Sequence, residues 1–249
     1  MKCKFLLVLL FAGIFCCAAQ QYGGAPRHDI VKLSLLWPNS YCLTNDHNCR
    51  PNVPQYFTID GLWAEMNNGD KLENCETRYY MTNSMIDSHK VELLKYWPDL
   101  STYNYQDSKQ LWKNKWETDG TCCSYLMRPE DYLVSAMNLR QSHNMYQILT
   151  NAGGILANGS SYPATKILDA IRKATRFMVD IVCETDRVGN VYLSEIHQCL
   201  DNHAGAFVDC DNKAVNCDQD PIFPDALFAA AAKTNRKASP TYVTRLAAY

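Results

Sequence analysis

The number and position of the cysteines constrain this chain more than any other feature of its sequence. Two lysines near the start, an apolar run over residues 5–15 and small residues after it form the pattern of a secretory signal peptide. We expect this peptide to cover residues 1–19, with cleavage after Ala19 or close to it. Nine of the twelve cysteines lie beyond it: Cys42, Cys49, Cys75, Cys122, Cys123, Cys183, Cys199, Cys210 and Cys217. In an oxidising compartment, this set predicts a disulfide-bonded fold with one thiol left over.

The composition is that of a secreted globular domain. A chain of 249 residues, 47% of them hydrophobic, is long enough to bury a sizeable core. No other apolar run could cross a bilayer, so we expect no membrane association. Without the signal peptide, 22 Lys and Arg stand against 26 Asp and Glu, which gives no electrostatic reason to expect nucleic-acid binding. The cysteine spacing does not fit a zinc site, so we expect no metal and no cofactor.

Hydrophobic patterns predict a mixture of strands and helices. Alternation predicts a strand at 30–37 and a second one at 56–63, which ends near Gly61. Helical spacing predicts helices at 82–96, 128–154 and 164–177, and further strands follow at 190–200 and 206–210. Because helices and strands do not alternate regularly, the pattern indicates the α+β class.

The chain is predicted to hold one domain and a tail. We expect residues 20–224 to form the domain. Residues 225–249 are Ala-rich and basic, and we interpret them as a C-terminal appendage with the composition of a frayed helix. Asn158 begins the one Asn-x-Ser/Thr sequon of the chain, which predicts a glycosylated surface loop in a secreted protein.

Several longer motifs occur in order along the chain. They read WPNSYC (37–42), FTIDGLW (57–63), KYWPDL (95–100), WKNKWETDGTC (112–122), SYPATKILDAIRKAT (161–175) and VDIVCE (179–184). With these motifs the chain resembles the T2-type ribonucleases from about residue 30 to residue 224, especially the secreted S-like ribonucleases of plants. The resemblance implies a ribonuclease T2-like α+β fold, in which a central antiparallel sheet packs against helices.

The resemblance also locates the positions that carry catalysis in this family. Its members cut RNA by transphosphorylation through the ribose 2′-hydroxyl, using histidines as base and acid and a lysine and a glutamate to support the phosphorane. The first family segment reads Phe-Thr-Ile-His-Gly-Leu-Trp, and here its histidine is replaced by Asp60. The second reads Trp-x-His-Glu-Trp-x-Lys-His-Gly-Thr-Cys. Its four functional residues are replaced, in order, by Asn114, Lys115, Thr118 and Asp119.

These replacements predict that catalysis has been lost. With its histidines charged, the family's site carries about +3, whereas two carboxylates and one lysine give about −1 here, so the site repels phosphate. Losing one proton-transfer group costs about 10²–10⁴ in rate, and such residues act as a unit. Substrate contacts implied by the resemblance are also absent, because Leu36 stands for a glutamine and Leu111 for a phenylalanine. We therefore expect RNA to bind only weakly, if at all.

The resemblance implies four disulfides. They are Cys42–Cys49, Cys75–Cys122, Cys183–Cys217 and Cys199–Cys210. Cys123 is then the spare thiol, although its neighbour Cys122 could exchange roles with it. Relatives commonly carry one further disulfide. Both of its cysteines are missing here, so no unpaired cysteine results from its loss.

Other uses of the altered positions are weaker hypotheses. Asp60 and Asp119, with Asn114, could hold a hard cation such as Ca²⁺, or could act as a glycosidase pair. We favour solvated or capped carboxylates in a disused cleft, with Lys115 in a local ion pair with Asp119. His89 is the nearest candidate to replace a lost histidine, but a lone helical histidine is more often structural.

The sequence therefore predicts a catalytically inactive ribonuclease T2-family protein, monomeric and directed to the secretory pathway, extracellular or vacuolar. A storage or stress- and defence-associated role fits such a protein best. The alternatives are residual endoribonuclease activity and non-catalytic binding of RNA or a nucleotide in the old cleft.

Overall fold

A computed structural model of the protein describes residues 28–44, 48–211 and 214–235. The expected signal peptide, residues 1–19, and the tail beyond residue 235 lie outside the described residues. Among the helices that are described, none has the length and apolar character needed to cross a membrane.

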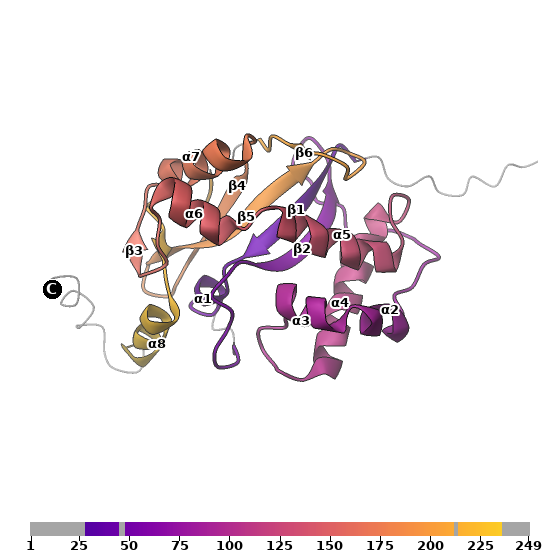
Figure 1. The fold of residues 1–249 in the computed structure, drawn as a ribbon, viewed down its shortest axis with the longest axis horizontal. Helices are drawn as coiled ribbons and strands as arrows, with labels where there is room; N and C mark the ends of the chain where they lie inside the picture. The colour runs from indigo at the N-terminus through magenta and orange to yellow at the C-terminus, as the bar shows by residue number, and fades with distance from the viewer. Residues whose placement is uncertain (1–27, 45–47, 212–213, 236–249) are drawn as a thin grey trace, which may run out of the picture.

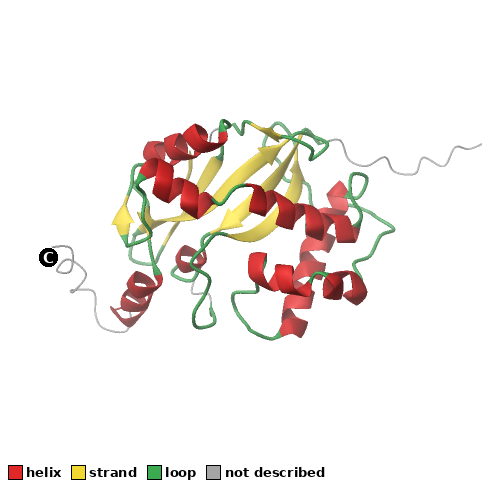
Figure 2. Cartoon of the chain, viewed as in Figure 1, coloured by secondary structure: helices red, strands yellow, loops and turns green. Residues whose placement is uncertain are grey.

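The centre of the domain is a twisted, mainly antiparallel sheet (Figure 1, Figure 2). Its main strands follow the order β2-β1-β5-β4-β7, with bounds Thr58–Glu65, Ile30–Leu36, Val191–Leu200, Asp180–Thr185 and Ala214–Val215. Among the described strands, only β4 and β7, and β5 and β8, pair in parallel. The short outer strands are β3 (Ser160–Ser161), β6 (Phe207–Val208) and β8 (Ile222–Phe223). This sheet confirms the predicted α+β class with a central antiparallel sheet.

The helices form two groups around the sheet. Figure 1 shows α5 (Pro129–Ser142), α6 (Met145–Gly153) and α7 (Ala164–Thr175) along one side of it. Beyond β2 lie α2 (Asn83–Ser88), α3 (Lys90–Tyr96) and α4 (Tyr105–Thr118), followed by the 3-10 turn η1 (Gly120–Cys123). The short helix α1 (Pro38–Tyr41) follows β1, and α8 (Ala226–Asn235) is the last element.

Two predicted helices are each divided in the structure. The helix expected at 82–96 is interrupted at His89, whose backbone leaves the helical region and separates α2 from α3. The helix expected at 128–154 is interrupted at His143 and Asn144. The Asn144 side chain accepts a hydrogen bond from the backbone N–H of Gln147 and so begins a new helix, α6. Pro129 and Gly154 stand at the outer ends, where proline and glycine are favoured.

The prediction that the second strand stops near Gly61 is wrong. Strand β2 continues past Gly61 to Glu65. The irregularity near Gly61 is a β-bulge in which Asp60 is the extra residue. Ile59 pairs with Leu35 and Gly61 pairs with Ser34, which leaves Asp60 without a partner across the strand pair. A bulge of this kind re-aims a side chain and is common beside functional sites.

The beginning of the predicted tail packs on the domain. Helix α8 buries Ala229 against Leu43 and Tyr192, and Phe228 packs at their edge. Just before the helix, the Trp37 indole N–H donates to the carbonyl of Pro224 at 2.8 Å. This part of the predicted appendage is therefore attached to the sheet and to α1.

The structure contains the four disulfides that the resemblance implies. They join Cys42 to Cys49, Cys75 to Cys122, Cys183 to Cys217 and Cys199 to Cys210. Cys123 is a buried free thiol.

Candidate functional site

The altered family positions lie where β2 meets the C-terminal half of α4. Trp112 and Trp116 are four residues apart on α4 and both are buried, so this helix is fixed against the core. The same helix carries Lys115 toward the bulge at Asp60. The Lys115 Nζ lies 3.0 Å from Asp60 Oδ2, and both side chains are partly exposed. The prediction that Lys115 pairs with Asp119 is therefore wrong, because the bulge brings Asp60 to it instead.

Asp119 is the most buried of the altered residues. It follows α4 directly and is only 2% exposed. The backbone of β2 passes close to it, since a Cβ built on Gly61 would lie 3.1 Å from Asp119 Oδ2. Burial raises the pKa of Asp119, while Lys71 and, further away, Lys115 act in the opposite direction.

Lys71 is the partner of Asp119, and sequence reasoning missed it. It lies in the loop of residues 66–76 between β2 and α2, and its Nζ is 2.8 Å from Asp119 Oδ1 and 2.9 Å from Glu73 Oε1. The ammonium also lies 4.8 Å from the centre of the Trp63 ring. Burial opposes the charged form of Lys71, but the bonds to Asp119 and Glu73 outweigh it, so its pKa is raised.

Asn114 and Thr118 take part in local contacts of the helix. Asn114 is exposed, and its Oδ1 accepts a hydrogen bond from Gln110 Nε2 at 2.7 Å. The carbonyl of Thr118 accepts from the backbone N–H of Asn74 at 2.8 Å, which ties α4 to the 66–76 loop. Neither contact involves Asp60 or Asp119.

The two positions at which we expect substrate contacts to be lost are part of the apolar packing. Leu36 is 5% exposed at the end of β1. Leu111 is half-buried on α4 and packs against the main core. An aliphatic side chain offers no hydrogen bond to a nucleobase, so these positions supply packing rather than polar recognition.

A further polar cluster lies on the sheet next to Trp63. Glu195 Oε2 accepts a hydrogen bond from Ser34 Oγ at 2.7 Å and lies 2.7 Å from His197 Nε2. The His197 ring meets the Trp63 ring edge-on at 5.2 Å. Burial alone would raise the pKa of Glu195, but His197 and Ser34, with Lys115 nearby, hold it below the usual range. Glu195 and His197 lie two positions apart on strand β5. This spacing in the sequence indicates that both side chains lie on the same face of the sheet.

His89 does not lie among these residues. It stands between α2 and α3, where its Nε2 is 3.0 Å from Glu130 Oε1 on α5. The rescue hypothesis for this histidine therefore finds no support in its contacts.

The site as a whole is rich in carboxylates that hold lysines. Two lysines, Lys71 and Lys115, are surrounded by four carboxylates: Asp60, Glu73, Asp119 and Glu195. Because each ammonium is paired, presenting one to a phosphate requires breaking an ion pair. The same pairing disfavours the cation hypothesis, since Ca²⁺ would have to displace a lysine from Asp60 and Asp119.

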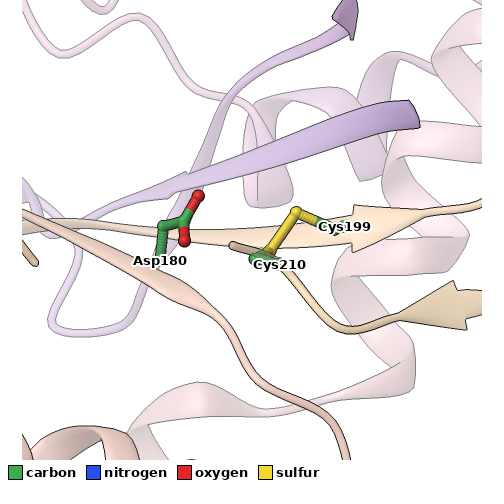
Figure 3. A group of neighbouring side chains, drawn as sticks. All are labelled: Asp180, Cys199 and Cys210. Atoms are coloured by element: carbon green, nitrogen blue, oxygen red, sulfur yellow. A yellow bond between two sulfur atoms is a disulfide. The ribbon is translucent and has the colours of Figure 1, made fainter. Parts of the chain in front are cut away.

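A group with metal-ligating side chains lies elsewhere on the sheet. Ligand atoms of Asp180, Cys199 and Cys210 lie within 4.8 Å of one another. Figure 3 shows the two sulfur atoms joined to each other, beside the carboxylate. Lys32 Nζ is 3.0 Å from Asp180 Oδ2 and 2.7 Å from Glu65 Oε1. Because the sulfurs are used in the disulfide, this group does not offer thiolates to a metal.

The chain is similar to several known plant proteins. Ribonuclease 1 of Arabidopsis thaliana is 28% identical over 225 residues, which cover 89% of this chain and 91% of the relative. A ribonuclease-like storage protein of Panax ginseng is 28% identical, with 76% of this chain and 79% of the relative covered. The solved structure of the self-incompatibility-associated SF11-RNase of Nicotiana alata superposes with a TM-score of 0.68 at 28% identity, covering 80% of this chain and all of that one.

The match to the family extends over most of the described chain. Residues 28–210 match the Ribonuclease T2 family, and this range contains β1, the bulged strand β2, helix α4 and all five altered positions. The shared fold, the motif order and the position of the altered residues all point to the same conclusion: the chain belongs to the ribonuclease T2 family.

Proposed function

We propose that this chain is a catalytically inactive member of the ribonuclease T2 family. The observation that carries the proposal is the content of the five positions at which the resemblance places the catalytic groups: Asp60, Asn114, Lys115, Thr118 and Asp119. None of these side chains is an imidazole. The one amine among them, Lys115, is held by Asp60 at 3.0 Å. Cleavage of RNA needs an acid, a base and positive charge on the phosphorane, and these residues supply no such set.

We further propose a storage or stress- and defence-associated role in the secretory pathway, either extracellular or vacuolar. The similarity to a ribonuclease-like storage protein supports the storage role. Four disulfides support an oxidising compartment, because such bonds are rare in the cytosol.

An in-gel RNA-cleavage assay tests the loss of catalysis. Purified, disulfide-intact protein at about pH 5–7 should give no cleared band, because cleavage of RNA by general acid–base catalysis needs both an acid and a base. A cleared band at the mass of the protein overturns the proposal if the double variant Asp60→Ala/Lys115→Ala, loaded at equal amount, reduces it. A band that is equal in both proteins is a contaminant.

Titration with single-stranded RNA at low salt separates the binding alternative from the inactive protein. The paired lysines and the excess of carboxylates predict no saturable binding in the micromolar range. Saturable binding without cleavage would instead favour a non-catalytic role in RNA or nucleotide recognition.

Glycosylation at Asn158 is also part of the proposal. The side chain is exposed, and its Oδ1 accepts a hydrogen bond from the backbone N–H of Ser160 at 3.0 Å in the turn before β3. Removal of N-glycans from the secreted protein should lower its mass, and Asn158→Gln should already have the lower mass. An unchanged mass in the wild-type protein would contradict the glycan.

A further inference from the structure

Trp63 differs from the other tryptophans of the chain in what covers it. Trp37, Trp97, Trp112 and Trp116 are each at most 1% exposed and lie in the core, whereas Trp63 is 7% exposed. All five lie in the described residues, so this comparison is complete. One cover of the Trp63 ring is a charged side chain, the ammonium of Lys71 at 4.8 Å from the ring centre. An ammonium over an indole face is attracted electrostatically by the ring. The Lys71 side chain is 33% exposed, so its ammonium can leave the ring without opening the core.

The backbone that carries Lys71 is fixed, so only its side chain is free to move. Lys71 forms an isolated bridge with Glu65, and the next N–H, that of Leu72, donates to the carbonyl of Ala64 at 2.9 Å. Further along, the N–H of Cys75 donates to Thr121 Oγ1 at 3.1 Å, and the Cys75–Cys122 disulfide joins the 66–76 loop to η1. A four-carbon stem on an anchored backbone can turn its charged end from one partner to another.

Two carboxylates hold the ammonium over the ring, and they are not equivalent. The Glu73 side chain is 45% exposed, so its ion pair with Lys71 is of the surface kind, which contributes little. The Asp119 side chain is 3% exposed, so its charge depends much more strongly on its partner. The ionisation of Asp119 therefore decides how firmly Lys71 is held.

We propose that Lys71 is a proton-controlled latch over Trp63. When Asp119 takes up a proton from solvent, its carboxylate becomes a neutral acid and the ion pair with Lys71 is lost. The ammonium then keeps only its exposed partner Glu73 and turns outward to solvent, and the indole face of Trp63 becomes accessible to solvent. Loss of the proton from Asp119 restores the ion pair and closes the latch.

The surroundings of Asp119 support protonation above the ordinary range of an aspartate. Burial raises its pKa, Lys71 and Lys115 lower it, and Asp60 on β2 raises it again, with a net increase. The two other titratable neighbours, Cys123 and Tyr132, stay neutral at the pH values at which Asp119 takes up its proton. Burial raises the pKa of the Cys123 thiol on η1 to about 12, and burial raises the pKa of the Tyr132 hydroxyl on α5 as well.

The latch goes beyond the proposed loss of catalysis and does not depend on it. Its test reads the position of one side chain and not the cleavage of RNA, so either proposal can fail without the other.

Quenching of tryptophan fluorescence by acrylamide, a neutral probe, measures the latch directly. Because the other four tryptophans are buried, the quenching constant reports on Trp63, and Trp63→Phe should remove the response. We expect the wild-type constant to rise severalfold as the pH falls from about 7 to about 4, toward the ordinary pKa of an aspartate. Lys71→Ala should give the high constant at every pH, and Asp119→Asn should give it already at about pH 7.

Lys115→Ala is the matched control. It removes the other lysine of the site, which pairs with Asp60. Within the described residues, the cation over the Trp63 ring is Lys71 and not Lys115. Its quenching at about pH 7 should be as low as that of the wild type. The rise on acidification should remain and begin at a somewhat higher pH, because Lys115 also lowers the pKa of Asp119. The latch is overturned if the wild-type constant does not change with pH while Lys71→Ala is high, or if Lys71→Ala equals the wild type. Circular dichroism checks the fold of each variant, and Lys71→Ala keeps the test decisive if Asp119→Asn does not fold.

Discussion

At the scale of single residues, the two new carboxylates have unequal surroundings. Asp60 is partly exposed on a bulge and pairs with Lys115, so solvent screens its charge. Asp119 is buried, and its one close ammonium does not fully offset the loss of water. Of the two replacements, Asp119 is therefore the one whose charge should affect the stability of the domain.

The pH dependence of stability should reveal Asp119. Its pKa is raised in the folded state, so below that pKa the folded protein binds a proton that the unfolded chain does not yet bind. The free energy of unfolding of the wild type, relative to Asp119→Asn, should therefore increase as the pH falls through this pKa, down to about pH 4, the ordinary value of an aspartate. Urea unfolding of both proteins at several pH values measures the difference. A difference that does not vary with pH would contradict the assignment.

Gly120 is a second residue whose effect follows from close packing. A Cβ at this position would lie 2.4 Å from Trp116 Cε3 and 3.1 Å from Tyr132 Cε2, and both rings are buried. Gly120→Ala should therefore lower the free energy of unfolding by about 1–3 kcal/mol.

Gly205→Ala is the control for that substitution. Its Cβ would meet only Asp201 oxygens, the nearest at 3.8 Å, so stability should stay within about 0.5 kcal/mol of the wild type. Equal losses in both variants, measured by urea unfolding, would show that the contact with Trp116 is not the cause.

At the scale of elements, the 66–76 loop connects the two segments that carried the family's site. Its backbone bonds reach β2 at Ala64 and α4 at Thr118, and its disulfide reaches η1. The loop therefore holds β2 and α4 in a fixed position relative to each other.

The Cys75–Cys122 disulfide should be important for the relative position of β2 and α4. It joins residues 47 apart in sequence, whereas Cys42–Cys49 joins residues 7 apart. In the chain-entropy account, removing the long-range bridge as Cys75→Ala/Cys122→Ala should cost about 1–2 kcal/mol more than removing the short one as Cys42→Ala/Cys49→Ala. Urea unfolding of the two double variants measures this, and an equal or smaller loss for the long-range pair would contradict it.

Elements were predictable where one periodicity ran without interruption. The alternation of Val31, Leu33 and Leu35 predicted β1, and the apolar face of α7 predicted that helix. The bulge in β2 also left a signal that the prediction did not use. The residues that join the main hydrophobic core change from odd numbers, Phe57 and Ile59, to even numbers, Leu62 and Ala64. Such a change of phase is what one inserted residue produces.

At the scale of the whole molecule, the chain has the fold of the family. The family motifs predicted the four disulfides and the framework around the expected site, because they carry structural residues such as Trp112, Trp116 and Gly120. They could not predict Lys71, which reaches Asp119 across 48 positions of the sequence through a contact that no local pattern specifies. The motifs therefore describe the framework, whereas the ion pairs depend on the tertiary structure.

Cleavage of RNA by the wild type and by a restored variant, side by side, tests the central claim most directly. The restored variant carries Asp60→His, Asn114→His, Lys115→Glu, Thr118→Lys and Asp119→His, and both proteins keep their disulfides. We predict that the wild type stays at the rate of the protein-free control, because each missing proton-transfer group costs about 10²–10⁴ in rate, and that the restored variant cleaves measurably. Cleavage by the wild type at a rate similar to that of the restored variant would contradict the account.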